Sequence, residues 1–452
     1  MPYLEPLKRK IINRYEMRTP ASKSIHDANK LVVPGGDTRA IAHFDPYPFF
    51  ADRGYGCYLA DVDGNEYIDC VNNMTALVHG HGHPAVVKAI CDQARNGTSH
   101  SAPVEVQHKL ARHLCDRIPS LGKIRFCNCG TEATLFALRA ARAFTGRDVI
   151  IKMDGGYHGG HDGVQVNVSA DVDAEGLPRS LPTWGVPKSV AMDVIVAPFN
   201  DLATMDRILS QNRDRIAAII TEPIFGAGGG AMAQDGYLEG LRTLADQHGV
   251  LLIFDEVITL RVHEGGYESV CRVKPDLIAM GKLIGGGLPI GAFGGREDVM
   301  AVFDHTQPKY IVHSGTFTGN ALTMKAGFAC MENFMQPEIN RINALGDRVR
   351  VGLTNAFKES GVKGNASGYG SLVYIYFFND SFKTGKQYAT LAAPTLDFLK
   401  IMNLALLNTG LFCMVKGFIL LALSTPMDEV VADEIINKFK NALEMVAPLA
   451  RE

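Results

Sequence analysis

The sequence predicts an α/β fold built on a mainly parallel, helix-covered sheet. Three short apolar runs indicate buried strands, because a strand covered on both faces lacks polar alternation: Ile216–Thr221, Leu251–Phe254 and Leu277–Met280. A helical pattern at Tyr237–His248 separates the first two, and such alternation is typical of parallel strands joined by crossover helices. With 452 residues, 46% of them hydrophobic, the chain is long enough for two domains and a large core.

Elements in the first part of the chain follow from periodicity and turn chemistry. Asp63-Gly64 is a type I′ turn signal, so Tyr58–Asp69 is expected to form a hairpin. Pro84 suits the first position of a helix, because its missing N–H has no helical partner there. The other elements expected here are helices at Pro6–Arg18, Ala85–Ala94 and Thr131–Phe144 and strands at Lys123–Cys127 and Asp148–Met153.

From about Met331 the pattern shifts to alternating amphipathic helices and short strands. We therefore expect a large domain at 66–329 and a smaller α+β domain formed by 330–452 together with the N-terminal segment 1–65. The later elements expected are strands at Pro289–Gly295, Leu372–Phe377 and Phe418–Leu423 and helices at Arg296–Phe303, Ala321–Met335, Asp347–Phe357 and Asp428–Ala447.

Two of the predicted strands end in residues with catalytic potential. Asp255 follows Leu251–Phe254, and Lys282 follows Leu277–Met280 after one glycine. The carboxyl ends of parallel strands meet at one sheet edge, where α/β folds place ligand sites. Alone, the Asp indicates a helix cap or surface carboxylate, and the Lys a solvated strand end. Together they match what pyridoxal phosphate enzymes need: an amine for the cofactor aldehyde and a carboxylate against the pyridinium nitrogen.

The segments around both residues resemble a known family. Asp255-Glu256-Val257 and Gly281–Pro289 resemble two signatures of the class III aminotransferases of fold type I, and the resemblance extends from about Pro34 to about Asn320. The Lys segment is most similar to glutamate-1-semialdehyde aminomutase and the β-amino acid aminotransferases. The resemblance implies pyridoxal 5′-phosphate as cofactor, Lys282 as the covalent link and proton carrier, and a homodimer with shared active sites.

A turn of small residues precedes the predicted helix Thr131–Phe144. Such a turn at a helix N-terminus offers free backbone N–H groups to a phosphate, although most turns of this kind merely begin a helix. The turn resembles the family's SGTEA phosphate turn, with Cys129 in place of the usual Ser. The resemblance implies phosphate contacts from Gly130 and Thr131, and a weaker one from Cys129, which lacks the hydroxyl.

Further cofactor residues are implied by the family's other motifs. Tyr157 in a Tyr-His-Gly sequence is expected to stack on the cofactor ring, with His158 near by and Val257 on the opposite face. Glu222, in a Glu-Pro pair after a strand, is expected close to the site, and a purely structural role is equally compatible. Thr316, in a Gly-Thr-Phe segment, is expected to reach the phosphate of the partner subunit's cofactor.

Two cationic residues are candidates for substrate binding. Arg39 follows a Pro-Gly-Gly stop, and a guanidinium can bind a carboxylate with two hydrogen bonds. The family's late carboxylate-binding Arg is matched here by Lys416, which brings charge without a fork, so 2-oxoglutarate is a doubtful acceptor. Ile258 stands where the ornithine and 4-aminobutyrate branches carry Gln, which favours the aminomutase and β-amino acid branches.

Bulk composition argues against several other classes of protein. A formal net charge of −3 gives no reason to expect nucleic acid or an anionic membrane surface as partner. The nine cysteines lack paired zinc spacing, and the alternate histidines between His79 and His83 are expected to belong to a loop, so no metal is predicted. The charged N-terminus does not resemble a secretory signal, and polar residues interrupt the apolar stretch Leu404–Leu423. A reducing, cytoplasmic location follows.

Three functions fit these patterns. The first is an aminotransferase that acts on a β- or other amino acid with one carboxylate and a keto acid or aldehyde acceptor. The second is an aminomutase or amino-acid epimerase that uses the same cofactor without a second substrate. The third is a binding or regulatory protein that keeps the fold without the chemistry, and the presence of both Asp255 and Lys282 argues against it.

Overall fold

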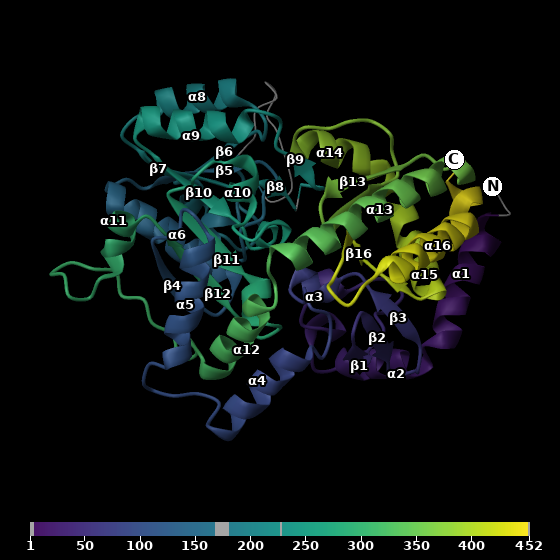
Figure 1. The fold of residues 1–452 in the computed structure, drawn as a ribbon. Helices are drawn as coiled ribbons and strands as arrows, with labels where there is room; N and C mark the ends of the chain where they lie inside the picture. Colours follow the sequence, from purple (N-terminus) through teal and green to yellow (C-terminus); the bar gives the residue numbers. More distant parts are fainter. Residues whose placement is uncertain (1–3, 168–179, 227, 451–452) are drawn as a thin grey trace. The chain divides into compact units, whose positions relative to one another are not determined.

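The computed structural model describes residues 4–167, 180–226 and 228–450. The chain forms two compact units (Figure 1), a small unit of Met1–His83, Asn340–Asp380 and Thr390–Glu452 and a large unit of Pro84–Ile339 and Ser381–Ala389. Domain boundaries were expected at residues 65 and 329. In the structure the chain passes from the small unit to the large one after His83 and returns after Ile339, and the short segment Ser381–Ala389 also belongs to the large unit.

The large unit is built on a seven-stranded sheet with the order β4-β12-β11-β10-β7-β5-β6. Only β12 is antiparallel to its neighbours, so the other six strands run in the same direction. Burial on both faces explains the continuous apolar runs, and the predicted α/β fold class is confirmed. The strands are β4 (Lys123–Cys127), β5 (Val149–Met153), β6 (Val194–Ala197), β7 (Ile216–Thr221), β10 (Leu251–Asp255), β11 (Leu277–Gly281) and β12 (Gly291–Gly295).

Helices cover this sheet, and α6 (Gly130–Thr145) lies closest to the candidate site. Its sheet-facing side is made of small residues such as Ala133, Ala137 and Ala141, all fully buried, which allows close approach to β11 and β12. Two further helices, α8 and α9, pack against each other (Figure 1). The other α-helices described in the large unit are α4 (Pro84–Arg95), α5 (Glu105–Arg117), α7 (Lys188–Ala191), α8 (Leu202–Gln211), α9 (Tyr237–His248), α10 (Tyr267–Cys271), α11 (Glu297–Met300), α12 (Ala321–Glu332) and most of α14 (Gly385–Ala392).

The small unit contains two four-stranded sheets, with the orders β1-β2-β3-β15 and β13-β14-β17-β16. The parallel pair β3–β15 brings the N-terminal sheet together with a strand from the last fifty residues. The strands of these two sheets are β1 (Ala51–Tyr55), β2 (Tyr58–Asp61), β3 (Glu66–Asp69), β13 (Asn365–Tyr369), β14 (Leu372–Tyr376), β15 (Leu411–Phe412), β16 (Met414–Val415) and β17 (Ile419–Ala422). Its helices include α1 (Leu4–Arg18), α2 (Pro20–Asn29), α15 (Leu396–Thr409) and α16 (Glu429–Val446), and α13 (Gln336–Ser360) begins in the large unit.

Two helix boundaries differ from the prediction for the same reason. The helix expected at Pro6–Arg18 is followed almost at once by a second helix, α2, which begins at Pro20. The helix expected at Asp347–Phe357 is part of a longer one, because α13 begins at Gln336, directly before Pro337. Proline is tolerated in the first turn of a helix, because the N–H groups there have no helical acceptor. Each proline therefore marks a helix start. The stretch from Ser169 to Val190 has little periodicity in the sequence and is expected to form an ordered excursion; it lies partly outside the described residues.

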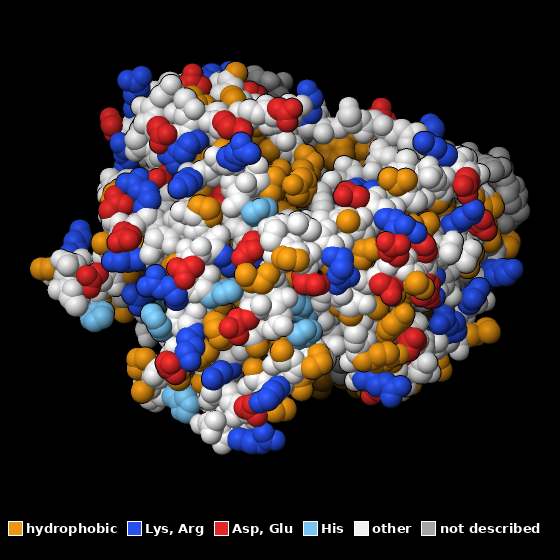
Figure 2. Space-filling view, viewed as in Figure 1, with side chains coloured by type: hydrophobic (Ala, Val, Ile, Leu, Met, Phe, Trp, Pro, Cys, Tyr) orange, Lys and Arg blue, Asp and Glu red, His pale blue; other side chains and the backbone are white. Residues whose placement is uncertain are grey.

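One helical stretch, Gly385–Thr409, is long and apolar enough to cross a membrane by length and composition alone, and 44% of its most apolar window is buried. Its second part, α15, packs against α1 and α16 within the small unit. This packing accounts for the apolar face as part of a protein core. On the face in Figure 2, acidic and basic side chains are interspersed on both units, as expected from the small net charge.

Gly294 offers a test of the packing that joins β12 to β4. A Cβ atom at this position would lie 2.3 Å from the carbonyl oxygen of Lys123, and the neighbouring strand cannot move away without breaking sheet hydrogen bonds. We expect Gly294→Ala to destabilise the protein by about 1–3 kcal/mol, seen as a lower melting temperature. Gly160→Ala is the matched control, since nothing lies within 4 Å of its Cβ position. Equal melting of both variants would contradict this account.

Candidate functional site

Three ionisable residues lie at one edge of the large sheet. Glu222 directly follows β7, Asp255 is the last residue of β10, and Lys282 directly follows β11. These strands are adjacent, parallel and in register, so their carboxyl ends lie side by side. The structure thus brings together residues that are sixty positions apart in the sequence, at the edge where α/β sheets bind ligands.

The carboxylate of Asp255 is buried and braced by two donors. The Nδ1 of His158 lies 2.8 Å from Oδ2, and the backbone N–H of Val257 donates to Oδ1 at 3.1 Å. Burial lowers the pKa of His158, so the imidazole is neutral at pH 7 and carries its proton on Nδ1 to serve as donor. The sequence analysis placed His158 only near the site, and the structure shows that it orients Asp255.

Desolvation brings the pKa values of the two other groups, Lys282 and Glu222, close to each other. It lowers the pKa of the Lys282 amine to about 8, against the charges of Asp255 and Glu222, which raise it. Burial, and next the charge of Asp255, raises the pKa of Glu222 to about 8. The Glu222 carboxyl also accepts the backbone N–H groups of Tyr157 at 3.3 Å and Gly226 at 3.1 Å. The site therefore holds an amine that can lose its proton near neutral pH.

The turn before α6 has the features of an anion site. Cys129 is extended and exposed, and no side chain caps the helix that begins at Gly130, so the first N–H groups remain available. Glycines let this turn approach the strand ends. A Cβ at Gly291 would lie 2.0 Å from the Cys129 carbonyl oxygen, and one at Gly281 would lie 3.5 Å from the Gly130 nitrogen. The turn and Lys282 therefore belong to the same site.

Thr131 connects this turn to the loop after β5. Its Oγ1 accepts the N–H of Gly160 at 3.1 Å, and a Cβ at Gly159 would lie 2.6 Å from the Thr131 Cα. The hydroxyl of Thr134, about one helical turn after Thr131, donates to the His158 carbonyl. The sequence analysis missed Thr134, because a buried Thr in a helix usually only donates to the preceding turn.

The two residues predicted to contact the cofactor ring lie after different strands, Tyr157 after β5 and Val257 after β10. Tyr157 is 50% exposed and is held through its backbone by Glu222. Val257 packs its methyl groups 3.1–3.2 Å from the Cβ position of Gly130. Thr316 lies on an exposed segment between η6 (Ala301–Phe303) and α12, where nothing in the described chain covers it.

Arg39 lies in the small unit on a loop that contacts an unusual turn. Its Nη1 donates to the Asn73 Oδ1 at 2.7 Å, and no carboxylate among the described residues pairs with it. Asn73 belongs to α3 (Asn72–Thr75), whose four residues all have φ between 47° and 71°. A left-handed turn without glycine costs about 1–2 kcal/mol per residue. Asp69 holds it by accepting the N–H groups of Val71 and Asn72, both at 2.9 Å.

Lys416 occupies the tip of the tight hairpin between β16 and β17. Its backbone exchanges two hydrogen bonds with Phe418, at 2.8 and 2.7 Å, and Gly417 between them has φ of 69°. The side chain is exposed, and no acidic residue among those described forms an ion pair with it. Within the small unit, both candidate carboxylate-binding residues thus present free positive charge.

The family model for class III aminotransferases matches residues 41–445. The chain belongs to the class III aminotransferases. It is 39% identical over 365 residues to a glutamate-1-semialdehyde 2,1-aminomutase of Methanocella arvoryzae, covering 80% of this chain and 84% of that protein.

Two solved structures match over nearly the whole chain. An omega-transaminase from Sphaerobacter thermophilus has 39% identity and a TM-score of 0.91, and the match covers 96% of this chain and 98% of that one. A β-phenylalanine aminotransferase from Variovorax paradoxus has 32% identity and a TM-score of 0.89, with 98% of each chain covered. Class III aminotransferases are enzymes that depend on pyridoxal phosphate, so the predicted family, enzyme class and cofactor are confirmed.

The donor set of this site fits that cofactor. An amine with a lowered pKa can react with an aldehyde, a buried carboxylate braced by a neutral imidazole can face a pyridinium nitrogen, and an uncapped helix start can bind a phosphate. Among the described residues, no group of three or more His, Cys, Asp or Glu side chains could hold a metal ion.

The charge of Asp255 is expected to control the titration of Lys282. Because Asp255 raises the pKa of that amine, Asp255→Asn should move its titration below pH 8. Reductive methylation of the protein without cofactor, followed for the Lys282 peptide as a function of pH, measures this shift. Asp235→Asn, at an exposed position, is the control. An unchanged Lys282 profile in Asp255→Asn would show that the two groups do not interact.

Proposed function

We propose that the protein is an aminotransferase that moves an amino group from an amino acid with one carboxylate, such as a β-amino acid, to a keto acid or aldehyde acceptor. The observation that carries this proposal is the Lys282 amine, with its pKa near 8, at the same sheet edge as Asp255. When bound, pyridoxal phosphate supplies the electron sink that makes the substrate carbon acidic. Lys282 would then carry the proton to and from that carbon.

We assign the remaining cofactor contacts to the residues that converge on this edge. The backbone of Cys129, Gly130 and Thr131 would hold the phosphate. The Thr131 hydroxyl accepts a hydrogen bond from Gly160 through its oxygen, which leaves its own hydrogen to donate to the phosphate. Tyr157 and Val257 would lie against the two ring faces, with Asp255 at the ring nitrogen.

Glu222 and His158 would act around these contacts. His158 holds Asp255 in place, and Glu222 adds a group that gains or loses a proton near pH 8.

The substrate carboxylate would be bound by Arg39, with Lys416 as a second positive charge. The partners of its guanidinium support Arg39, because among the described residues it bonds a neutral amide oxygen, of Asn73, and no carboxylate. Lys416 offers a point charge, so an acceptor with a second carboxylate, such as 2-oxoglutarate, would lack a bidentate partner there.

The assembly would be a homodimer in which Thr316 completes the partner subunit's phosphate site. The exposed large side chains of the Thr316 segment, among them Val312 and Phe317, support a covered position in the assembly. All nine cysteines are free, which fits a reducing cytoplasm.

A second candidate function is an aminomutase, with an epimerase as a related variant. The similarity to the aminomutase of Methanocella arvoryzae favours it, and the residues assigned above would serve either reaction. Two transaminase structures are 39% and 32% identical to this chain over nearly its whole length, against 25% for an aminomutase structure, and this higher identity favours the aminotransferase.

A half-reaction separates the two. With β-phenylalanine or another β-amino acid as the only substrate, an aminotransferase should release one equivalent of keto acid and lose the yellow colour of its cofactor, because no acceptor restores it. An aminomutase or epimerase should turn over repeatedly on its single substrate and keep the colour at steady state. Absorbance spectra with product quantification measure this, and glutamate 1-semialdehyde is the comparison substrate. Sustained turnover without an acceptor would reject the aminotransferase.

Arg39→Ala should weaken binding of carboxylate donors about 10- to 100-fold, the usual effect of losing a charged bidentate contact. Amines without a carboxylate should be unaffected. Arg39→Lys should recover part of the loss, since charge returns without the fork. The exposed Arg53→Ala, on β1, is the matched control. The apparent Kd of each donor, from the cofactor spectrum, is the measurement, and equal values for Arg39→Ala and the parent would remove Arg39 from the site.

A further inference from the structure

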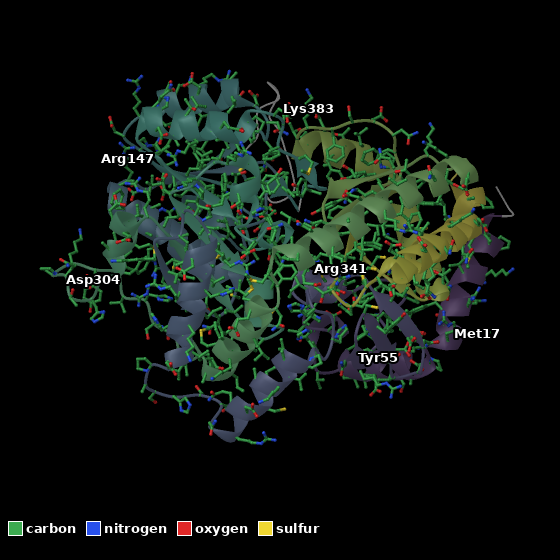
Figure 3. All side chains as sticks on the ribbon, in the orientation of Figure 1. Met17, Tyr55, Arg147, Asp304, Arg341 and Lys383 are labelled. Atoms are coloured by element: carbon green, nitrogen blue, oxygen red, sulfur yellow. The ribbon has the colours of Figure 1, made fainter. Side chains whose placement is uncertain are left out.

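The connection between η6 and α12 contains neither helix nor strand. It projects from the large unit (Figure 1), and Asp304, at its start, is labelled in Figure 3. Tyr310, Val312 and Phe317 are 44%, 68% and 62% exposed. Because these three large apolar side chains bury little surface against the described chain, their packing contributes little to fixing the conformation of the segment. Thr316, proposed above to act in the partner subunit, lies among them.

His313 is the exception, because it is packed and hydrogen-bonded. Its ring meets the ring of Phe136 edge-on at 4.3 Å between centroids, and those of Phe293 and Phe303 at 5.3 and 6.1 Å. Arg125 Nε donates to His313 Nδ1 at 3.0 Å. Burial and the charge of Arg125 lower the pKa of His313 to about 4, so the ring is neutral and can accept at pH 7.

Arg125 is fixed in turn by the body of the large unit. It lies in the middle of β4, its Nη1 donates to the Phe303 carbonyl at 3.0 Å, and its guanidinium lies 5.6 Å from the centre of the Phe303 ring. A planar donor with two partners and a stacked face has little freedom to follow a moving loop. The Arg125–His313 pair therefore anchors the exposed segment to a rigid strand.

Strand β4 also leads directly into the turn before α6, which is proposed above to hold the phosphate of the chain's own cofactor. β4 ends at Cys127, directly before Asn128, and a Cβ at Gly315 would lie 3.5 Å from the Asn128 Nδ2. Asn128 is itself held by Glu132, which accepts its backbone N–H at 2.8 Å. The turn before α6 and the segment that carries Thr316 are thus both attached to β4, the first through the chain itself and the second through the Arg125–His313 hydrogen bond.

We propose that Arg125 and His313 are positioning residues that hold Thr316 in place for the phosphate of the cofactor bound in the partner subunit. This inference rests on the proposed function. Neither side chain touches the cofactor in this account. The pair fixes the residues around His313, so that Thr316 meets the phosphate without a further cost in conformational freedom. Loss of the pair should therefore weaken cofactor binding in the other subunit.

Removal of the acceptor tests the anchor. His313→Phe keeps an aromatic ring but leaves Arg125 Nε without its partner, and we expect the Kd for pyridoxal phosphate to rise on the order of tenfold. His313→Asn should restore most of the affinity, because its amide oxygen can accept in the place of Nδ1. His305→Phe, exposed in the same segment, is the control. Kd is measured by titration of the cofactor-free protein, and the dimer is checked by sedimentation.

Mixed dimers show in which subunit the pair acts. In a dimer of His313→Phe with Lys282→Ala, the one remaining Lys282 site receives an intact His313 segment, so we expect parental affinity. In a dimer of the parent with a His313→Phe, Lys282→Ala double variant, the remaining site receives the altered segment, so we expect weak binding. The borohydride-fixed label on Lys282, measured against cofactor concentration, reports only this site. The opposite pattern would place the effect within one subunit and overturn the inference.

The failures of the two proposals are distinguishable. A parent protein that binds no pyridoxal phosphate at Lys282 would reject the proposed function and this inference with it. A parent that binds the cofactor, together with a His313→Phe variant of the same Kd, would reject the inference alone.

Discussion

The site depends on placing three ionisable groups at one desolvated sheet edge. The protein interior penalises the charged forms there, and this desolvation shifts the pKa of Lys282 and the pKa of Glu222. Desolvation makes Lys282 a weaker base and Glu222 a weaker acid, and both then titrate near pH 8. Asp255 is held in place, because His158 and the backbone N–H of Val257 each form a hydrogen bond with one of its oxygens. A fixed carboxyl group next to an amine that loses its proton easily is the arrangement that the chemistry needs.

Close backbone approach is the second requirement, and glycine meets it. The carbonyl of Cys129 occupies the space of a side chain at Gly291, and the Thr131 backbone occupies that of Gly159. Larger residues at either glycine would push the turn before α6 away from the strand ends that carry Asp255 and Lys282. The glycine-rich sequence of this region is thus a packing requirement, and the precision of the site depends on it.

The fold and the strand-end residues could be predicted because local rules determine both. Buried parallel strands are apolar along their whole length, and the residue after each strand reaches the ligand edge whatever the rest of the chain does. Residues that act through a partner could not be found in this way. The bond of His158 to Asp255 and that of Arg125 to His313 join positions almost one hundred or more residues apart, and nothing local marks them. The starts of α2 and α13 were not predicted, because a proline can follow the end of one helix or stand in the first turn of the next.

Substrate choice must come from residues other than the catalytic group, because an aminotransferase and an aminomutase need the same amine and the same carboxylate. Ile258 and Lys416 are two positions at which the sequence analysis expects this chain to differ from other branches of the family, and Arg39 is a cation with a planar fork whose described partner is the amide oxygen of Asn73. One fork binds one carboxylate in a defined orientation, whereas a lysine at a hairpin tip attracts a second anion without orienting it. If Arg39 and Lys416 bind the substrate as proposed, a substrate with a single carboxylate gains most of the available binding energy, and a dicarboxylate gains little more. This asymmetry is the physical reason to favour monocarboxylate amino acids.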